Sequence, residues 1–351
     1  MEKKERIIDL KIDHLRQGMK IADDVENRFG GVLIPSGTII MKEQIRKLIE
    51  NDIEEVKIYL QSGDDIKENI EKTTNPKKVY KKDIEKSKSL YRNVKNRYDI
   101  EYDDVRDLTE DAETLSKKLK LSELISLVQK ADLYTYSHLL NTGVLANKFA
   151  DWLNLSDKKK RRLTVAGILH DIGKSQIPDK ILNKPEDLSK EEFAKIKDHV
   201  AHGYNILKKQ DLFAQEIVFG VLTHHERYDG SGYPLGMKGK DIPLFGRVLA
   251  IIDAFDAITS ERFYQSAVSP FKAVRIIKEE SFTDFDYELK NIFIRNITDF
   301  LKKEKVKLSN GEIARVVYID NIYPDQPLVE KDDGVIDLKN SPDLEIVELL
   351  E

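Results

Sequence analysis

The sequence of 351 residues predicts a mainly α-helical protein with a small α+β module at the N-terminus and a small β module at the C-terminus. In segment 116–302, apolar residues recur at intervals of three and four, as on the buried face of a helix. Before residue 60 and after residue 303, short β-prone runs alternate with Gly and Pro turns. Because 351 residues exceed the usual size of one compact core, we expect about two or three domains.

The N-terminal module is predicted to comprise residues 1–60, with short strands and one helix. Apolar residues on one helical face predict that helix near 41–50, and residues 56–59 are typical of a closing strand. Residues 61–115 are rich in Lys, Glu and Asp and poor in apolar residues. We predict that this segment is a charged, partly helical connector.

Residues 116–302 are predicted to form the helical domain. Val165, Ile168 and Ile172 follow the spacing of a buried helix face. Ser156 precedes this segment and is a residue type that caps helix starts, so we expect the helix to begin just after it.

The C-terminal module is predicted to comprise residues 303–351. An Asn310-Gly311 turn between two β-prone runs indicates a hairpin. Both terminal modules resemble accessory modules that flank a catalytic domain, and their motifs are weak. Each module could support homodimer formation, regulation by a ligand or docking of a signalling protein, or could contribute to stability alone.

Composition excludes several classes of protein. There are no cysteines, so disulfides and thiolate ligands are excluded and any metal must bind to His and carboxylate groups. No apolar run approaches the roughly 18 residues that a membrane helix needs, and residues 1–6 show no signal peptide. The net charge of −5 argues against a broad surface for DNA or RNA. We therefore expect a cytoplasmic protein with no membrane segment and no nucleic-acid polymer as partner.

The most informative stretch is His224-His225-Glu226, followed by the Gly-rich loop Asp229-Gly230-Ser231-Gly232-Tyr233-Pro234. Upstream lies His170-Asp171-Ile172-Gly173-Lys174. Imidazole and carboxylate groups are suitable ligands for iron, manganese or zinc. These motifs predict a metallohydrolase that acts on a phosphate ester.

The adjacent pair His170 and Asp171 suits a site with two metals. Neighbouring side chains on a helix point about 100° apart, so the carboxylate can bridge two ions while the imidazole binds one. Two ions about 3.5–4 Å apart clamp a phosphate and convert a bridging water to hydroxide near neutral pH. Lys174 adds a cation beside them.

These motifs resemble the HD-GYP family, a branch of the HD-domain metal-dependent phosphohydrolases. The resemblance covers roughly residues 124–285 and includes Asp132 to Thr135 before His138, Lys197-Asp198-His199, and Asp253 to Ala257. It implies a helical HD-domain bundle and a dinuclear or trinuclear iron or manganese centre. It also implies hydrolysis of cyclic di-GMP to the linear dinucleotide or GMP through a metal-bridging hydroxide.

The family's functional positions are carried over residue by residue. Asp171 would bridge the metals, and Lys174 would stabilise charge on the scissile phosphate. Tyr233 would shape the substrate mouth, and Arg262 would contact substrate phosphate. The implied ligands are His170, Asp171, His199, His224, His225 and Asp253.

Two positions depart from the family pattern. The family often has Arg-Pro-Tyr-Arg where this chain has Arg262-Phe263-Tyr264-Gln265, so a second cation is missing. Members with three metals have a glutamate where this chain has Tyr134. We therefore expect two divalent ions, iron or manganese, and assign His138 to a place beside the ligands or the substrate.

The sequence also allows plainer interpretations of these residues. Asp253 suits a buried ion pair or a helix cap, Lys174 suits a cation at a helix C-terminus, and the glycines of loop 229–234 suit an ordinary turn. Two further functions stay open, an HD-type hydrolase of another nucleotide and a cyclic di-GMP sensor without turnover.

Overall fold

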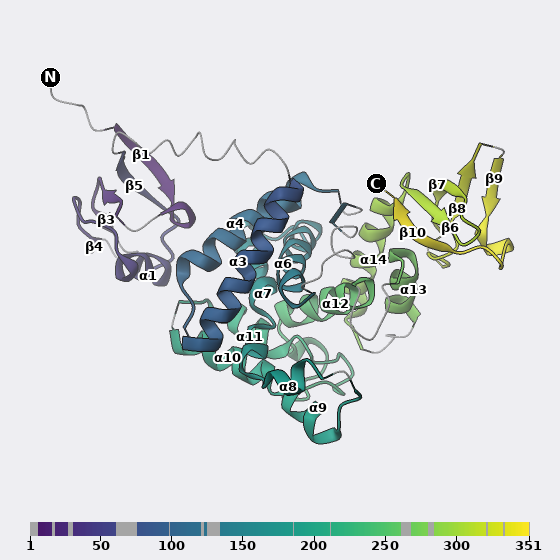
Figure 1. Ribbon diagram of the computed structural model, residues 1–351. Helices are drawn as coiled ribbons and strands as arrows, with labels where there is room; N and C mark the ends of the chain where they lie inside the picture. Colours follow the sequence, from purple (N-terminus) through teal and green to yellow (C-terminus); the bar gives the residue numbers. More distant parts are fainter. Residues whose placement is uncertain are drawn as a thin grey trace. The chain divides into compact units, whose positions relative to one another are not determined.

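The computed structural model divides the chain into two compact units, Met1–Thr74 and Asn75–Glu351 (Figure 1). The residues that the structure describes are 6–15, 18–26, 31–60, 76–97, 99–120, 123–124, 134–184, 186–210, 212–260, 268–279, 284–320, 322–332 and 334–350.

The first unit is a small α+β module, as predicted. Strand β5 lies between β1 and β2 in an antiparallel sheet, in which Ile8 pairs with Ile58. The predicted helix near 41–50 and the strand near 56–59 are confirmed by α1 and β5. The elements are β1 (Arg6–Lys11), η1 (Ile12–His14), β2 (Lys20–Ile21), β3 (Val25–Glu26), β4 (Val32–Ile34), α1 (Lys42–Glu50) and β5 (Glu55–Leu60).

The second unit is mainly helical, which confirms the predicted fold class. Helix α7 packs against α6, α11 and α12, and α10 packs against α11 and η2. The helical elements are α3 (Pro76–Arg97), α4 (Tyr102–Lys118), α6 (Tyr134–Trp152), α7 (Asp157–Leu169), η2 (Ile172–Gln176), α8 (Asp179–Leu182), α9 (Lys190–Lys197), α10 (His199–Gln210), α11 (Gln215–Thr223), η3 (Gly239–Asp241), α12 (Leu244–Thr259), α13 (Pro270–Glu279) and α14 (Tyr287–Leu301).

Helix α7 shows how local sequence sets an element of this unit. Ser156 caps its start, because the side-chain oxygen accepts a hydrogen bond from the Lys159 amide. Ile168 is fully buried and Val165 is partly buried, as the apolar spacing predicted. The helix ends just before His170. Its C-terminal end therefore delivers the His-Asp motif to the core.

The charged segment predicted as a connector contains two helices that belong to the helical core. Helices α3 and α4 pack against each other and against α6. Tyr80, Leu90 and Val94 of α3 are buried, as is Leu108 of α4. Most charged residues of these helices are exposed or partly exposed, although Asp83 and Arg106 are buried, so composition alone concealed an amphipathic pattern.

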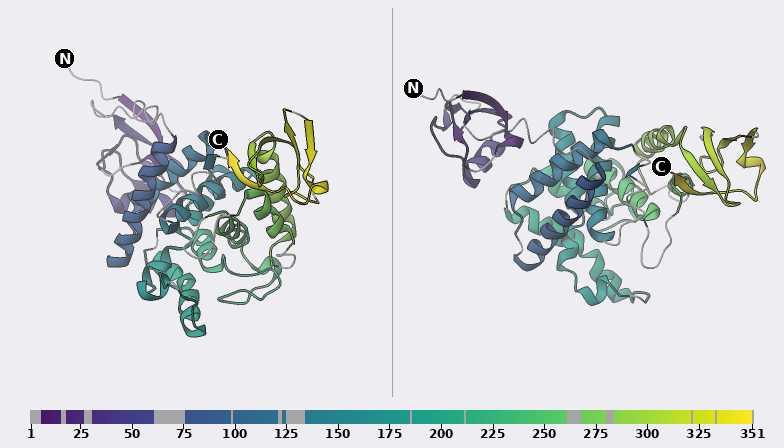
Figure 2. Two further views of the ribbon diagram at one scale, coloured as in Figure 1. Left: turned by 45° about the vertical axis from the view of Figure 1, so that its right-hand side comes forward. Right: turned by 45° about the horizontal axis from the view of Figure 1, so that its top comes forward.

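The C-terminal strands form one antiparallel sheet in the order β10-β6-β7-β8-β9. The predicted hairpin is confirmed by β6 and β7, in which Val306 pairs with Ala314. The sheet lies beside α13 and α14 in all three views (Figures 1 and 2), and Arg275 of α13 donates to Asp325 at 2.8 Å. The elements are β6 (Lys305–Leu308), β7 (Ile313–Tyr318), β8 (Leu328–Lys331), β9 (Gly334–Asp337), η4 (Leu338–Asn340) and β10 (Ile346–Leu350).

Among the helices within the described ranges, none combines the length and the apolar character that crossing a bilayer requires.

Candidate metal centre

The predicted ligands converge at the ends of helices. His170 follows α7, His224 follows α11, and His199 is the first residue of α10. Asp253 projects from within α12. The helices that carry these residues pack on one another, so residues that are far apart in sequence meet in one buried cluster.

One oxygen of Asp171 faces a group of imidazoles. Its Oδ1 lies 3.2 Å from His199 Nε2 and 3.8 Å from His224 Nε2. His225 belongs to the same group, in which potential ligand atoms from all four residues lie within 4.8 Å of one another. These residues could hold a metal ion.

The other oxygen of Asp171 faces a second group. Its Oδ2 lies 3.4 Å from His138 Nε2 and 3.5 Å from His170 Nε2. Asp253 Oδ1 lies 3.2 Å from His138 Nε2 and 3.8 Å from His170 Nε2. Asp171 therefore lies between two clusters of potential ligands, in the position that a bridging carboxylate would need.

Three imidazoles are oriented by the backbone in the same way. In each, Nδ1 donates a 2.8 Å hydrogen bond to the carbonyl three residues earlier, so in the neutral ring Nε2 carries a lone pair directed into the centre. His199 and His224 bring their Nε2 atoms to 3.4 Å. The pairs are His170 with Gly167, His199 with Ile196, and His224 with Val221.

His138 is oriented by a carboxylate instead. Its Nδ1 donates to Asp256 Oδ2 at 2.6 Å, and its Nε2 lies 3.0 Å from His170 Nε2. Both residues are nearly fully buried. This placement groups His138 with the potential ligands, since both of its ring nitrogens contact residues of the cluster. Sequence reasoning missed Asp256, although its place one helical turn after Asp253 was a signal of a shared face.

Burial and neighbouring charges control ionisation in the cluster. Burial alone would raise the pKa of Asp171, but Lys174 and the imidazoles hold that pKa well below its usual range. Burial would likewise raise the pKa of Asp253, and the hydrogen-bonding imidazoles of His138 and His170 hold it well below its usual range. Burial lowers the pKa of His224 to about 4, so its ring is neutral near pH 7.

The residues present fit divalent metals. Paired Nε2 atoms whose partner nitrogens already donate hydrogen bonds would direct lone pairs at each other, an arrangement that a cation between them stabilises. Asp171 Oδ1 is buried and accepts no hydrogen bond from any described residue. A metal ion would satisfy both the lone pairs and this oxygen. The donor set of nitrogen and oxygen suits iron, manganese or zinc.

Glu226 organises the loop after the paired histidines. Its carboxylate accepts hydrogen bonds from the amides of Leu235 at 2.7 Å and Met237 at 3.0 Å. At Gly232 a Cβ atom would lie 2.2 Å from the Arg227 nitrogen, so only glycine permits the loop to fold back this closely. The loop places the ring of Tyr233 on His225, with ring centroids 4.8 Å apart. Glu226 therefore stabilises the loop that carries Tyr233.

Gly173 allows η2 to approach α10. A Cβ atom at this position would lie 1.9 Å from the His199 carbonyl oxygen. The glycine after the His-Asp pair is thus needed for close backbone packing that brings His199 to Asp171.

The predicted substrate-binding residues have different outcomes. Lys174 Nζ pairs with Asp171 Oδ2, which places its ammonium beside the centre. Tyr233 lies at the loop, next to His225. Arg262 lies outside the described residues. Burial, and then the charge of Asp171, raise the pKa of the Tyr91 phenol in α3. Helix α3, in the segment predicted as a connector, packs against η2, the element that follows Asp171.

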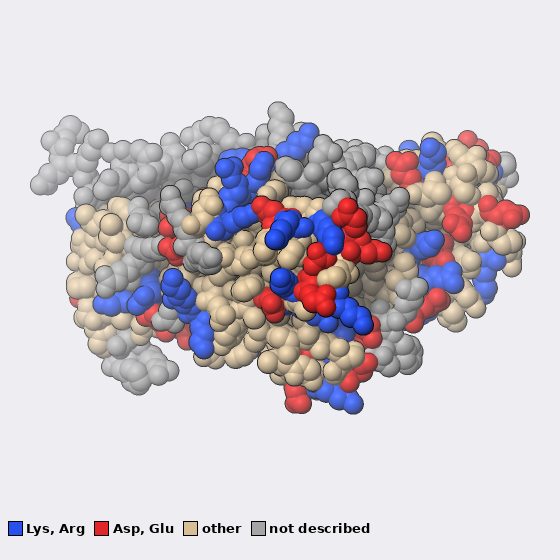
Figure 3. Space-filling model, turned by 60° about the horizontal axis from the view of Figure 1, so that its bottom comes forward, with Lys and Arg blue, Asp and Glu red and all other residues tan. Residues whose placement is uncertain are grey.

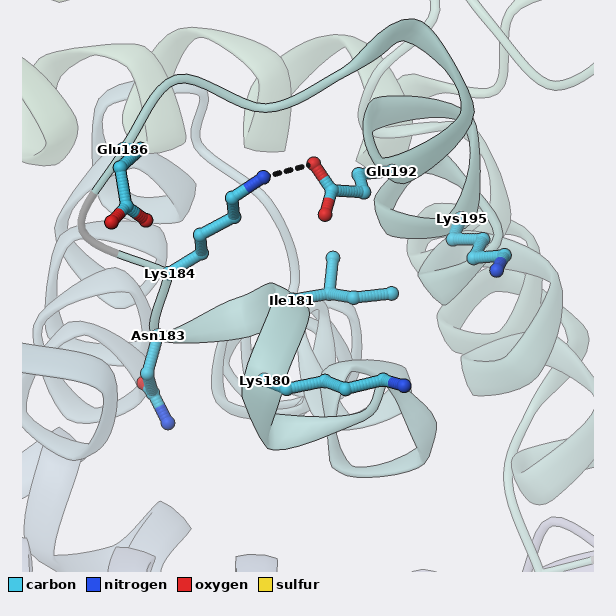
Figure 4. Close-up of a pocket in the computed structure, with 7 residues that line it drawn as sticks. All are labelled: Lys180, Ile181, Asn183, Lys184, Glu186, Glu192 and Lys195. Carbon is cyan, nitrogen blue, oxygen red and sulfur yellow. Dashed lines mark hydrogen bonds and ion pairs between the residues drawn. The ribbon is translucent and has the colours of Figure 1, made fainter.

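A separate cavity of about 560 Å³ lies between α8 and α9 (Figure 4). Lys180, Lys184 and Lys195 contribute to its lining, and Lys184 reaches across to Glu192 at 2.7 Å. Its lining includes none of the metal-site residues. This cavity is therefore distinct from the centre.

The chain is similar to known proteins over much of its helical unit. A model of the HD domain matches residues 88–289. A cyclic di-GMP phosphodiesterase from Thermotoga maritima is 33% identical over 230 residues, which cover 64% of this chain and 60% of that protein. A 3'3'-cGAMP-specific phosphodiesterase from Vibrio cholerae is 36% identical over 155 residues, which cover 44% of this chain and 34% of that protein.

A solved HDG"Y"P protein from Bdellovibrio bacteriovorus has the same fold, with a TM-score of 0.52 at 16% identity over 84% of this chain and all of that one. Because the matched model spans more than half of the chain, the protein belongs to the HD-domain family of metal-binding proteins. The resemblance to the HD-GYP branch is confirmed. The chain spans between about a third and three fifths of the length of these two relatives.

Proposed function

We propose that the protein is a metal-dependent phosphodiesterase that hydrolyses cyclic di-GMP to the linear dinucleotide or GMP. The position of Asp171 carries the proposal: its two oxygens face two separate groups of imidazoles whose Nε2 atoms converge. Relatives with this activity in their names support the choice of substrate.

In this proposal two divalent ions, iron or manganese, share Asp171. His199, His224 and His225 would complete the ligands of one ion. The second would be held by a group that includes His138, which the sequence assigned to a place beside the ligands or the substrate. The proposed second group is His138, His170, Asp171 and Asp253.

When bound, the metals would polarise the phosphate and supply hydroxide near neutral pH. Lys174 would stabilise negative charge on the non-bridging phosphoryl oxygens, because its ammonium already lies beside the centre. Asp171 would connect the two groups of ligands, because one of its oxygens faces each group. Asp256 would keep the His138 ring fixed through its 2.6 Å hydrogen bond, and Tyr233 and Arg262 would contact the substrate.

The charge distribution on the surface favours a small-molecule substrate over a nucleic-acid polymer. The face in Figure 3 shows basic and acidic side chains interspersed, without one continuous basic surface. The net charge of the chain is −5. We infer that phosphate recognition depends on the buried centre and on a few local cations.

A second candidate substrate is 3'3'-cGAMP. The Vibrio cholerae relative named for it is 36% identical over its matched residues, so this chain is a candidate for hydrolysing either cyclic dinucleotide. Hydrolysis of a different nucleotide and binding of cyclic di-GMP without turnover are the competing functions that an experiment must separate from these two.

A turnover panel tests these possibilities. Protein prepared without oxygen and loaded with Fe²⁺ or Mn²⁺ is incubated separately with cyclic di-GMP, 3'3'-cGAMP and a nucleoside triphosphate, and the products are separated by chromatography. We expect fastest hydrolysis of cyclic di-GMP, with Lys174→Met slowing it by about 100-fold as removal of a charge-stabilising group does. Tight binding of cyclic di-GMP with no product from the metal-loaded protein would identify a sensor instead.

A role in assembly or signalling is also proposed for the terminal modules. We propose that modules 1–60 and 303–351 flank the catalytic domain 116–302 and serve homodimer formation or docking of a signalling protein. Segment 61–115 would then join the N-terminal module to the catalytic domain, with α3 and α4 packed on it. The absence of cysteines from the sequence supports a cytoplasmic location.

A further inference from the structure

His225 is held differently from the other imidazoles of the centre. The other four each use Nδ1 in a hydrogen bond to a carbonyl or to a carboxylate. Within the described part of the chain, His225 makes ring contacts and no hydrogen bond of this kind. Its ring stacks on Tyr233, with centroids 4.8 Å apart and planes inclined by 22°. Tyr233 therefore helps to orient His225, together with the rings of His199 and His224.

Lys197 extends this stack. Its ammonium lies 5.0 Å from the centroid of the Tyr233 ring and 4.9 Å from the centroid of the Phe193 ring. These contacts link His225, Tyr233, Lys197 and Phe193 into one group, which we call the column. The Tyr233 ring contacts both the His225 ring and the ammonium, and these two contacts limit its movement.

The column is tied to the backbone that holds a second ligand. Lys197 is the last residue of α9, and His199 is the first residue of α10. The carbonyl of Ile196, next to Lys197, accepts the hydrogen bond from His199 Nδ1. The junction between α9 and α10 thus orients His199 through the Ile196 carbonyl. The same junction places Lys197 over Tyr233, the ring that contacts His225.

We propose that Lys197 is a positioning residue that acts through Tyr233 to fix the His225 ring in the metal centre. This inference rests on the proposed function only for the presence of the metal, and it does not depend on the identity of the substrate. A cation over a tyrosine ring stabilises it by an amount that corresponds to about 3- to 30-fold in affinity. Loss of the cation frees the tyrosine ring and, with it, the imidazole.

The test measures metal affinity without substrate. The full-length protein is stripped with a chelator and titrated with Mn²⁺, and free Mn²⁺ is followed by its EPR signal. Lys197→Met is expected to weaken one class of Mn²⁺ site by about 3- to 30-fold. Lys197→Arg restores the affinity, because a guanidinium also stacks on tyrosine. Lys195→Met is the matched control: this exposed lysine lies on the same helix and lines the separate cavity.

A double-mutant cycle tests the route of the effect. With Tyr233→Leu already present, Lys197→Met should cause no further loss of Mn²⁺ affinity. Wild-type affinity in Lys197→Met, an equal loss in Lys195→Met, or additive losses in the cycle would each overturn the assignment. Circular dichroism verifies that each variant is folded, and Lys197→Gln replaces the methionine variant if that one is not.

The outcomes for the two proposals are separable. If Mn²⁺ binds and depends on Lys197 as expected, but no cyclic dinucleotide is cleaved, the proposed function fails and the positioning role stands. If cleavage occurs but Mn²⁺ affinity is indifferent to residue 197, only the positioning role fails. A wild-type protein that binds neither Mn²⁺ nor Fe²⁺ overturns both.

Discussion

Two clusters of buried charged residues lie in the helical unit, and they neutralise their carboxylates in different ways. Between α3 and α4, Lys86 pairs with Asp83 at 3.1 Å and also with Asp111. In the metal centre, Asp171 and Asp253 face imidazoles, and the adjacent cation is Lys174. The first cluster joins one lysine to two carboxylates, whereas the second combines a lysine with several imidazoles that could bind a metal.

The difference is visible in ionisation. Burial, and then the charge of Asp111, raise the pKa of Asp83 to about 7, so this carboxyl accepts a proton easily. The pKa of Asp171 is held well below its usual range despite burial, because Lys174 and the imidazoles favour the charged form. A buried carboxylate kept ionised beside several imidazole nitrogens is suited to binding a cation. A carboxyl that protonates easily and already pairs with a lysine is better suited to stabilising the fold than to binding a metal ion.

The largest expected effect comes from removing the shared carboxylate. Asp171→Ala should abolish Mn²⁺ binding and turnover while most helical content remains, because both groups of ligands lose their common member. Asp83→Ala is the matched control from the other cluster and should bind Mn²⁺ as the wild type does. Metal analysis after desalting, with circular dichroism, measures both. Full activity in Asp171→Ala would refute the bridging role.

A smaller loss is expected from the residue behind a ligand. Asp256→Asn weakens the hydrogen bond that orients His138, and loss of such support reduces metal affinity or activity by about 10- to 100-fold. Ser260→Ala removes only a 3.3 Å contact to the same carboxylate and should change affinity little. A Mn²⁺ titration compares the two variants. Equal affinities would place His138 outside the ligand set.

The lysine of the structural cluster should affect stability and not metal binding. Lys86→Met leaves Asp83 and Asp111 without their cation and should lower the free energy of unfolding by about 2 kcal/mol, less than for a fully buried pair because the lysine side chain is 27% exposed. Urea denaturation measures this change. Reduced Mn²⁺ stoichiometry in this variant would contradict the separation of the two clusters.

A further effect expected from the same cluster is a pH dependence of stability. The folded protein holds a proton on Asp83 up to about pH 7, whereas the unfolded chain releases it near the ordinary value of 3.8. Between these values the folded state binds more protons, so this group's contribution to stability is greatest at low pH and falls as pH rises. Asp83→Asn should therefore lose less stability than the wild type between pH 5 and pH 8. The comparison uses urea denaturation at both pH values, and identical losses would contradict the assignment.

Much of the fold followed from local pattern. The spacing of Val165 and Ile168 predicted the buried face of α7, and Ser156 predicted its start. The same reasoning failed for residues 76–118, because their charged residues dominated the composition while the apolar ones shared one helical face. Packing against α6 decided that these helices belong to the core.

The sequence has no cysteine, which limits the candidate ligands to imidazole and carboxylate groups, and the resemblance to the HD-GYP family supplied the particular set. The tertiary structure alone grouped His138 with them, since its partner Asp256 is 118 residues away and no local spacing connects the two. It also decided that Glu226 supports a loop and that Lys197 lies over Tyr233. The sequence determines which chemical groups the protein has. The distances between side chains on different helices are fixed only when those helices pack.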